Sequence, residues 1–215
     1  MKKVHFSDDH HIHVPRGAFL LTVLIISILL SILSENLTIG PSWTILSIIV
    51  ILLVPMVFSM IRGHHGWTRV LALIIIGVVT LGLVSSVVFL VYSLFHHKAS
   101  AASLFRSAGL LWVVNIGVFG GWYWEIDRGG PLKRHSGKSE PADFLFPQMT
   151  FDINGWEKWT PTFLDYLYLA FNTNTAFSPT DTMVLSKRAK VVMMIQSSIA
   201  LLIVAVLAAR AINIA

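Results

Sequence analysis

The chain alternates between long apolar runs and short charged segments. Five runs contain no Asp, Glu, Lys or Arg: residues 17–34, 36–61, 70–95, 107–124 and 191–209. An α-helix rises about 1.5 Å per residue, so each run approaches or exceeds the roughly 20 residues that cross a bilayer. Peptide groups that face lipid must be hydrogen-bonded within their own segment. The pattern therefore predicts an all-α membrane protein with about five transmembrane helices in a lipid bilayer.

Composition points to the same class. The chain is 55% hydrophobic and 13% charged, whereas soluble domains are about 25% charged. Basic residues outnumber acidic ones by 16 to 11, as expected for a protein with basic residues flanking its membrane spans, so nucleic-acid binding is not predicted. The absence of cysteine excludes disulfides and cysteine-based metal or redox chemistry. Residues 1–16 carry Asp8 and Asp9 and no small-residue cleavage site follows, so the first helix is predicted to be retained.

Two regions are predicted. Residues 1–106 form an N-terminal region of three transmembrane helices, and residues 107–215 begin with an outer helix over 107–124. Residues 125–160 contain several glycines and prolines and read as a polar loop outside the hydrocarbon. Tryptophans at both ends of this loop are predicted to anchor it at the membrane interface.

The segment before the last helix is too short and too polar to be a simple span. Residues 161–172 predict a helix of little more than ten residues, with Thr160 as its N-cap. A hydroxyl-rich loop over 173–181 follows, and the inner helix covers 191–213. A short helix, a polar turn and a return to the same side predict a re-entrant segment. Such a segment is tolerated at membrane depth only when it is covered by protein or lines a water-filled cavity.

A few polar side chains interrupt the apolar helices. Asn115 and Gln196 are expected to form hydrogen bonds between helices. Asp165, on the short helix, is expected to pair with one of the three basic residues Lys187, Arg188 and Lys190. Glu125 and Asp127 are close in sequence and could serve as catalytic carboxylates. Ion pairs with Arg128, Lys133 or Arg134 are an equally good interpretation. No catalytic motif is present, and an enzyme is not predicted.

The order of parts in residues 107–215 resembles the pore module of potassium-channel-type proteins: outer helix, pore helix, filter loop and inner helix. The spacing of Phe171, Thr173, Thr175, Asp181 and Arg188 carries this resemblance. The stretches WYWEIDRGGP and AFSPTDT are also similar to an uncharacterised family of bacterial multi-pass membrane proteins. The second resemblance implies a bacterial cytoplasmic (inner) membrane, and the first implies a homo-oligomer, with four pore modules around one axis.

The filter itself departs from the potassium pattern. Potassium filters present backbone carbonyls from a Thr-Val-Gly-Tyr-Gly segment, and here Ala176, Phe177, Ser178, Pro179 and Thr180 occupy the corresponding positions. Both glycines are absent, so the usual potassium selectivity is not expected. Side chains would instead line a path for monovalent cations, helped by a ring of Asp181. The pore candidates are Asn172, Thr173, Asn174, Thr175, Ala176, Phe177, Ser178, Pro179, Thr180 and Asp181.

Charge bias conflicts with this resemblance. With five spans, 13 basic residues fall on the side of the N-terminus and of the re-entrant segment, and 3 fall on the other side. The positive-inside rule then places the re-entrant segment on the cytoplasmic face, whereas in potassium channels the pore loop enters from outside. The two expectations require opposite orientations.

Two other functions remain open from the sequence. A non-conducting scaffold or sensor would act through residues 125–160. A metal- or lipid-handling protein would use histidines, since imidazole binds zinc, copper and nickel. The metal candidates are His10, His11 and His13, while the pairs His64–His65 and His96–His97 fall at opposite ends of one predicted helix. No cofactor is predicted.

Overall fold

The computed structural model describes residues 14–33, 37–38, 40–96, 100–136, 140–150, 159–179 and 181–211. The helices in these ranges are α1 (Gly17–Ser31), α2 (Thr44–Ile61), α3 (His65–His96), α4 (Ala101–Ile126), α5 (Pro131–His135), α6 (Phe163–Ala176) and α7 (Lys187–Ala211). Two 3₁₀ turns, η3 (Asp127–Gly129) and η4 (Pro147–Met149), follow α4 and β1. Strands β1 (Phe144–Leu145) and β2 (Met183–Val184) pair antiparallel and are a small exception to the predicted all-α fold.

Within the described residues, four helical segments are long and apolar enough to cross a bilayer: Thr44–Ile61, His65–His96, Ala101–Gly129 and Lys187–Ala209. They confirm the prediction of a helical membrane protein in its coarse form. The first predicted span is shorter, because α1 has 15 residues, which is about 22 Å of helix. Crossing by α1 therefore remains a prediction.

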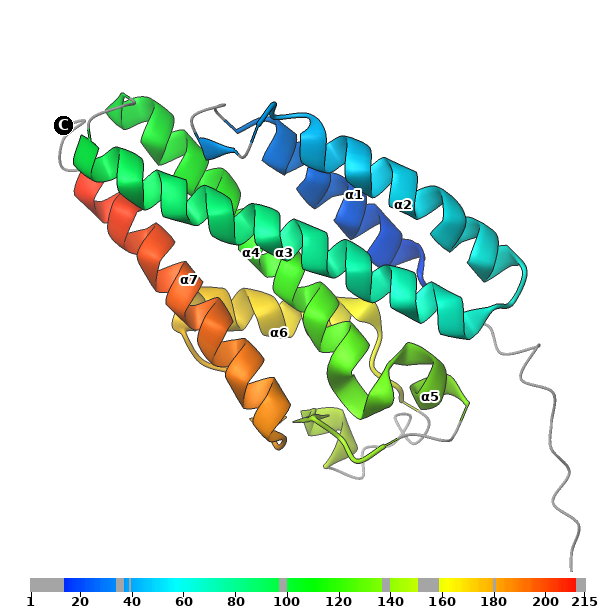
Figure 1. The fold of residues 1–215 in the computed structure, drawn as a ribbon. Helices are drawn as coiled ribbons and strands as arrows, with labels where there is room; N and C mark the ends of the chain where they lie inside the picture. The colour runs from blue at the N-terminus through cyan, green and yellow to red at the C-terminus, as the bar shows by residue number, and fades with distance from the viewer. Residues whose placement is uncertain are drawn as a thin grey trace, which may run out of the picture.

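The long helices form a bundle around α4 (Figure 1). Helix α4 contacts α1, α3, α6 and α7, while α2 lies on the outside against α1 and α3. Fifteen of the 26 residues of α4 are buried, which identifies it as the central helix. The shorter α6 lies across α4 and α7 near one end of the bundle (Figure 1).

Small residues let other helices approach α4 closely. A Cβ added to Gly117 would lie 2.5 Å from Cγ2 of Ile26 and 3.3 Å from Cγ2 of Thr22, both on α1. Gly120 faces α6 in the same way, with the Cα of Leu167 3.3 Å from an added Cβ. Glycine at these positions lets side chains of α1 and the backbone of α6 come into van der Waals contact with α4, and such packing is a main source of helix association in membranes.

We expect Gly117→Ala to destabilise the protein by about 1–3 kcal/mol, because the added methyl group overpacks the α1–α4 contact. Gly109→Ala on the same helix is the matched control, since nothing lies within 4 Å of its added Cβ. That control should be neutral or stabilising by up to about 1 kcal/mol, from alanine's higher helix propensity. Unfolding of both variants in detergent measures the difference. Equal stability of the two variants would show that α1 does not pack against α4 at Gly117.

The described parts of residues 125–160, which are 125–136, 140–150 and 159–160, contain more regular structure than the predicted loop. Helix α4 continues through Ile126, and α5, β1 and the two 3₁₀ turns follow it. Gly129 and Gly130 have φ of 76° and 99°, a region that glycine enters at little cost. These two glycines turn the chain from η3 into α5. Helix α4 therefore ends at Ile126, slightly later than the predicted end at residue 124.

Helix α6 starts and ends later than the predicted helix over 161–172. Its N-cap is Thr162 rather than Thr160, in a capping box with Asp165. The predicted pairing of Asp165 with a lysine or arginine is therefore wrong: its Oδ2 accepts hydrogen bonds from the backbone N and the Oγ1 of Thr162. The helix continues to Ala176 because Thr173 and Thr175 bond their hydroxyls to carbonyls one turn back. Such bonds satisfy the hydroxyls inside a helix.

Candidate functional site

Helix α6 runs from one end of the bundle to its middle. At its start the Phe163 ring packs edge-on against Phe19 and Trp124, with both pairs of ring centroids 5.9 Å apart. Near its end the amide nitrogen of Asn174 donates to the carbonyl of Trp112, 3.2 Å away. Trp124 and Trp112 are twelve residues apart on α4, or about 18 Å along its axis. The end of α6 therefore lies beside the middle of α4.

A buried polar cluster fixes that end of α6. Asn115 Nδ2 on α4 donates to Asn174 Oδ1 at 2.5 Å and to the carbonyl of Gln196 on α7 at 3.3 Å. The Gln196 side chain accepts a hydrogen bond from the Tyr123 hydroxyl and donates one to the Ala170 carbonyl. Asn115, Asn174 and Gln196 are fully buried. The predicted interhelical role of Asn115 and Gln196 is confirmed, and Asn174 is a member of the same cluster.

The chain turns sharply after α6. Phe177 has φ 53° and ψ 29°, which is left-handed backbone, and its side chain is 45% exposed. This conformation costs a bulky residue roughly 1–2 kcal/mol, and such strain is most common at functional positions. The chain then returns to the end from which α6 started, where β2 pairs with β1 and α7 begins.

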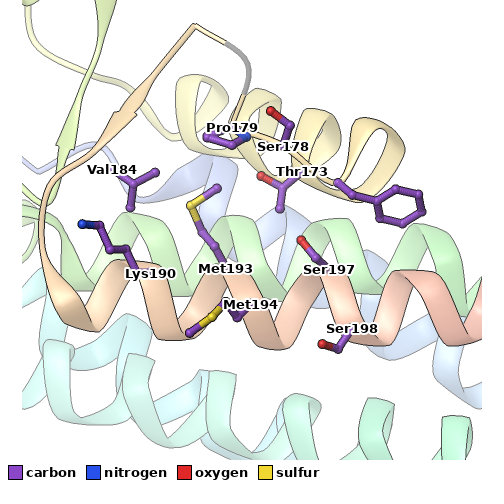
Figure 2. Close-up of a pocket in the computed structure, with 10 residues that line it drawn as sticks. Thr173, Ser178, Pro179, Val184, Lys190, Met193, Met194, Ser197 and Ser198 are labelled. Atoms are coloured by element: carbon purple, nitrogen blue, oxygen red, sulfur yellow. The ribbon is translucent and has the colours of Figure 1, made fainter.

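A groove of about 590 Å³ separates the end of α6 from α7 (Figure 2). Residues from α6 and the turn line one side, and residues from α7 line the other. The lining residues are Thr173, Phe177, Ser178, Pro179, Val184, Lys190, Met193, Met194, Ser197 and Ser198. Ser197 points toward α6 (Figure 2). The groove thus combines hydroxyl groups with flexible apolar side chains.

The structure separates the ten predicted pore residues. Thr173, Phe177, Ser178 and Pro179 line the groove, whereas Asn174 points into the bundle and holds α6 in place. The remaining described candidates are not part of the lining: Asn172, Thr175, Ala176 and Asp181. Thr180 lies outside the described residues. The α7 residues of the groove were not among the predicted site residues, although two adjacent serines in an apolar helix, Ser197 and Ser198, distinguish this position in the sequence.

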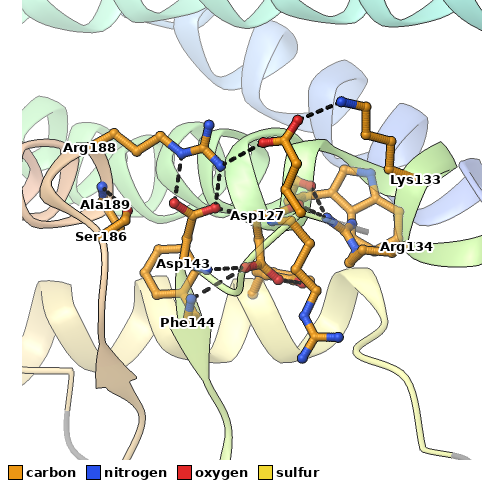
Figure 3. Close-up of polar contacts among 12 residues, drawn as sticks. Asp127, Lys133, Arg134, Asp143, Phe144, Ser186, Arg188 and Ala189 are labelled. Atoms are coloured by element: carbon orange, nitrogen blue, oxygen red, sulfur yellow. Dashed lines mark hydrogen bonds and ion pairs between the residues drawn. The ribbon is translucent and has the colours of Figure 1, made fainter. Parts of the chain in front are cut away.

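A second polar cluster joins the ends of α4, α6 and α7 (Figure 3). Arg188 on α7 donates two hydrogen bonds of 2.6 Å to the carboxylate of Asp143, which is 1% exposed. Asp127, at the end of α4, accepts from the backbone N of Asp143 and Phe144 and from the Tyr166 hydroxyl, at 2.9, 3.3 and 2.6 Å. The cluster ties the segment after α4 to the start of α7.

The pKa values of Asp143 and of the nearby Arg134 are both shifted. Burial by itself would raise the pKa of Asp143, but hydrogen bonds from Arg188 and Ser186 outweigh it and hold that pKa below its usual value. Burial lowers the pKa of Arg134. The Arg134 guanidinium stacks over Trp124, with 4.4 Å to the ring centroid, and donates to the carbonyls of Trp124 and Asp127. The hydrogen bonds from Arg188 and Ser186 thus favour the charged form of Asp143, whereas burial disfavours the charged form of Arg134.

Glu125 forms an ion pair that the sequence did not reveal. Its Oε1 lies 2.7 Å from Nη1 of Arg16, and the two side chains are 0% and 5% exposed. The two residues are 109 positions apart, so the pair depends on the packing of α1 against α4. The expectation that Glu125 forms its ion pair with Arg128, Lys133 or Arg134 is therefore wrong, because the residue that contacts its carboxylate is Arg16.

The basic helix ends meet at one end of the bundle. The Arg16–Glu125 pair places the start of α1 beside the end of α4, and Arg69 of α3 lies against Gly130. Arg188 joins the start of α7 to Asp143 in the same region. Arg106, by contrast, lies near the start of α4 at the opposite end. Among the described residues, Arg16, Arg69 and Arg188 thus share the end of the bundle opposite Arg106.

The described residues contain no group of three or more His, Cys, Asp or Glu that could hold a metal ion. The candidates His10, His11 and His13 lie outside the described residues. No family model, curated protein or solved structure matches this chain.

Proposed function

We propose that this chain is a channel-like membrane protein in which small ions pass along the groove between α6 and α7, within a homo-oligomer. In this proposal α1 is a fifth span, and α6 with the turn after it is a re-entrant segment. The observation that carries the proposal is the ending of a polar helix, followed by non-helical chain, beside the middle of two membrane-length helices.

The depth of that ending supports the proposal. Ser197 is ten residues into α7, or about 15 Å from its start. The hydrocarbon core is about 30 Å thick, so the groove would reach the middle of the bilayer if α7 starts at the interface. Irregular backbone at this depth is stable only where protein covers it or water reaches it. The Thr175 and Phe177 side chains are exposed on the protomer, so we infer that a second copy covers this surface.

The proposed orientation is the reverse of that in potassium channels. The basic end of the bundle would face the cytoplasm by the positive-inside rule, and α6 starts at that same end. The re-entrant segment would therefore enter from the cytoplasmic side. The resemblance to the potassium-channel pore module then concerns the order of parts alone.

Ion flux into liposomes tests the proposal. We expect flux of K⁺, Na⁺ or Cl⁻ through the purified protein, and we expect Ser197→Phe to reduce that flux at least tenfold by filling the groove. Ile195→Phe is the matched control, because Ile195 is on the same helix, 46% exposed and not part of the groove lining. Light scattering on each detergent-solubilised protein checks that its oligomeric state is unchanged. Absence of flux from folded wild-type oligomer, or equal flux from the two variants, would contradict the proposal.

The alternative of a scaffold acting through residues 125–160 has weaker support. In the described part of this segment, the charged side chains of Asp127, Arg134 and Asp143 bond within the chain. Lys133 and Glu140 pair with each other, although both remain more than 40% exposed. In the described part of this segment, these four contacts leave fewer charged groups available to a partner.

A further inference from the structure

We infer that Lys190 determines the charge preference of the groove, favouring anions over cations. This inference rests on the proposed function and specifies which ions the same site would accept. It differs from the sequence-based expectation, in which a ring of Asp181 favours cations.

Among the described residues that line the groove, Lys190 is the one with a formal charge. It projects from the first turn of α7, beside Val184, at the end of the groove nearest the basic end of the bundle (Figure 2). The other lining residues are hydroxyl-bearing or apolar. Asp181 is exposed and is not among them. Any ion that enters the groove from this end passes an ammonium group.

The basic side chains at the start of α7 differ in whether an acidic side chain lies beside them. Arg188 lies beside Asp143 and Glu140, with Nη2 to oxygen distances of 2.6 and 3.6 Å. Lys190 forms no ion pair with the acidic side chains of the described ranges. Lys187, one turn earlier on α7, does not line the groove. Among the described residues that line the groove, Lys190 therefore carries a charge that no ion pair balances.

The effect of this charge should be large enough to measure. Charges within about 8–10 Å of each other are only partly screened at physiological ionic strength. In an oligomer each copy contributes one Lys190, and rings of basic side chains select anions in pores. Serine and threonine hydroxyls deeper in the groove can donate to an anion as well as accept from a cation. We expect removal of the lysine charge to change the cation-to-anion permeability ratio about tenfold.

Reversal potentials in planar bilayers under a KCl gradient test this inference. We expect the wild type to favour Cl⁻ over K⁺, Lys190→Gln to raise the K⁺-to-Cl⁻ permeability ratio about tenfold, and Lys190→Glu to raise it further. Lys187→Gln removes the same charge from the same helix and should leave the ratio within about twofold. The ratio does not depend on how many channels insert. Lys190 is exposed, so its variants should fold, and matching thermal unfolding curves would verify this.

The possible failures are distinct. Currents with an unchanged ratio in Lys190→Gln, or with the same change in Lys187→Gln, would overturn the role of Lys190 and leave the channel proposal intact. Currents from a wild type that favours K⁺ would also overturn it. A folded wild type that carries no K⁺ or Cl⁻ current would overturn the proposed function and this inference with it.

Discussion

Glu125→Gln is expected to destabilise the protein by about 3–5 kcal/mol, one of the two largest effects that we predict. The substitution keeps the size of the side chain and removes its charge. Arg16 is 5% exposed and would lose the carboxylate to which it is bonded. Removal of one partner of a buried ion pair typically costs this amount, because an uncompensated charge stays behind.

Removal of the other partner, by Arg16→Met, should cost less stability. Arg69 and Arg134 also lie close enough to attract the Glu125 carboxylate, so Arg16→Met leaves that carboxylate partly compensated. We expect a loss of about 1–2 kcal/mol for Arg16→Met, below the range for breaking an isolated buried pair. Denaturant unfolding in detergent micelles, read by tryptophan fluorescence, measures both variants and the double variant. A larger loss for Arg16→Met than for Glu125→Gln would show that the other two arginines do not compensate Glu125.

Asp127→Ala is expected to have a comparable effect, a loss of about 3–5 kcal/mol. Asp127 is fully buried and accepts hydrogen bonds from Asp143, Phe144 and Tyr166. A hydrogen bond to a charged group contributes about 1.5–3 kcal/mol, and each buried donor left without a partner adds its own desolvation cost. These three bonds join the end of α4 to β1 and α6, so their loss should also loosen the segment after α4.

Tyr166→Phe is the matched comparison for Asp127→Ala. It removes one of the three bonds and keeps the aromatic ring, which packs edge-on against Trp124 and Phe146. We expect it to cost about 1.5–3 kcal/mol, the amount for a single hydrogen bond to a charged group. Thermal unfolding gives the stabilities, and limited proteolysis reports the exposure of the segment after α4. If the two variants lose the same stability, the backbone bonds to Asp127 contribute nothing and the proposed role of Asp127 is wrong.

Helix existence in this protein follows from local sequence. Apolar runs without charge predicted the helices over 70–95 and 107–124, because a segment in lipid must satisfy its own backbone. Helix ends were less accurate: α4 continues to Ile126 and α6 to Ala176. The predicted helices end just before the charged Glu125 and the hydroxyl-bearing Thr173. In the structure the helices continue, because Glu125 pairs with Arg16, and Thr173 and Thr175 bond to carbonyls of their own helix.

The sequence by itself determined the class of protein, the order of the helices and the position of the polar segment before the last helix. These features depend on composition and on hydrophobic runs within single segments. They can therefore be predicted without knowing any contact between distant residues. Tertiary structure alone decided which polar groups meet. Arg16 reaches Glu125, and Asn115 reaches Asn174 and Gln196, only because helices distant in sequence pack together. The same packing directs Asn174 inward and leaves Lys190 in the groove, because the side of a helix that faces its neighbours depends on the whole bundle.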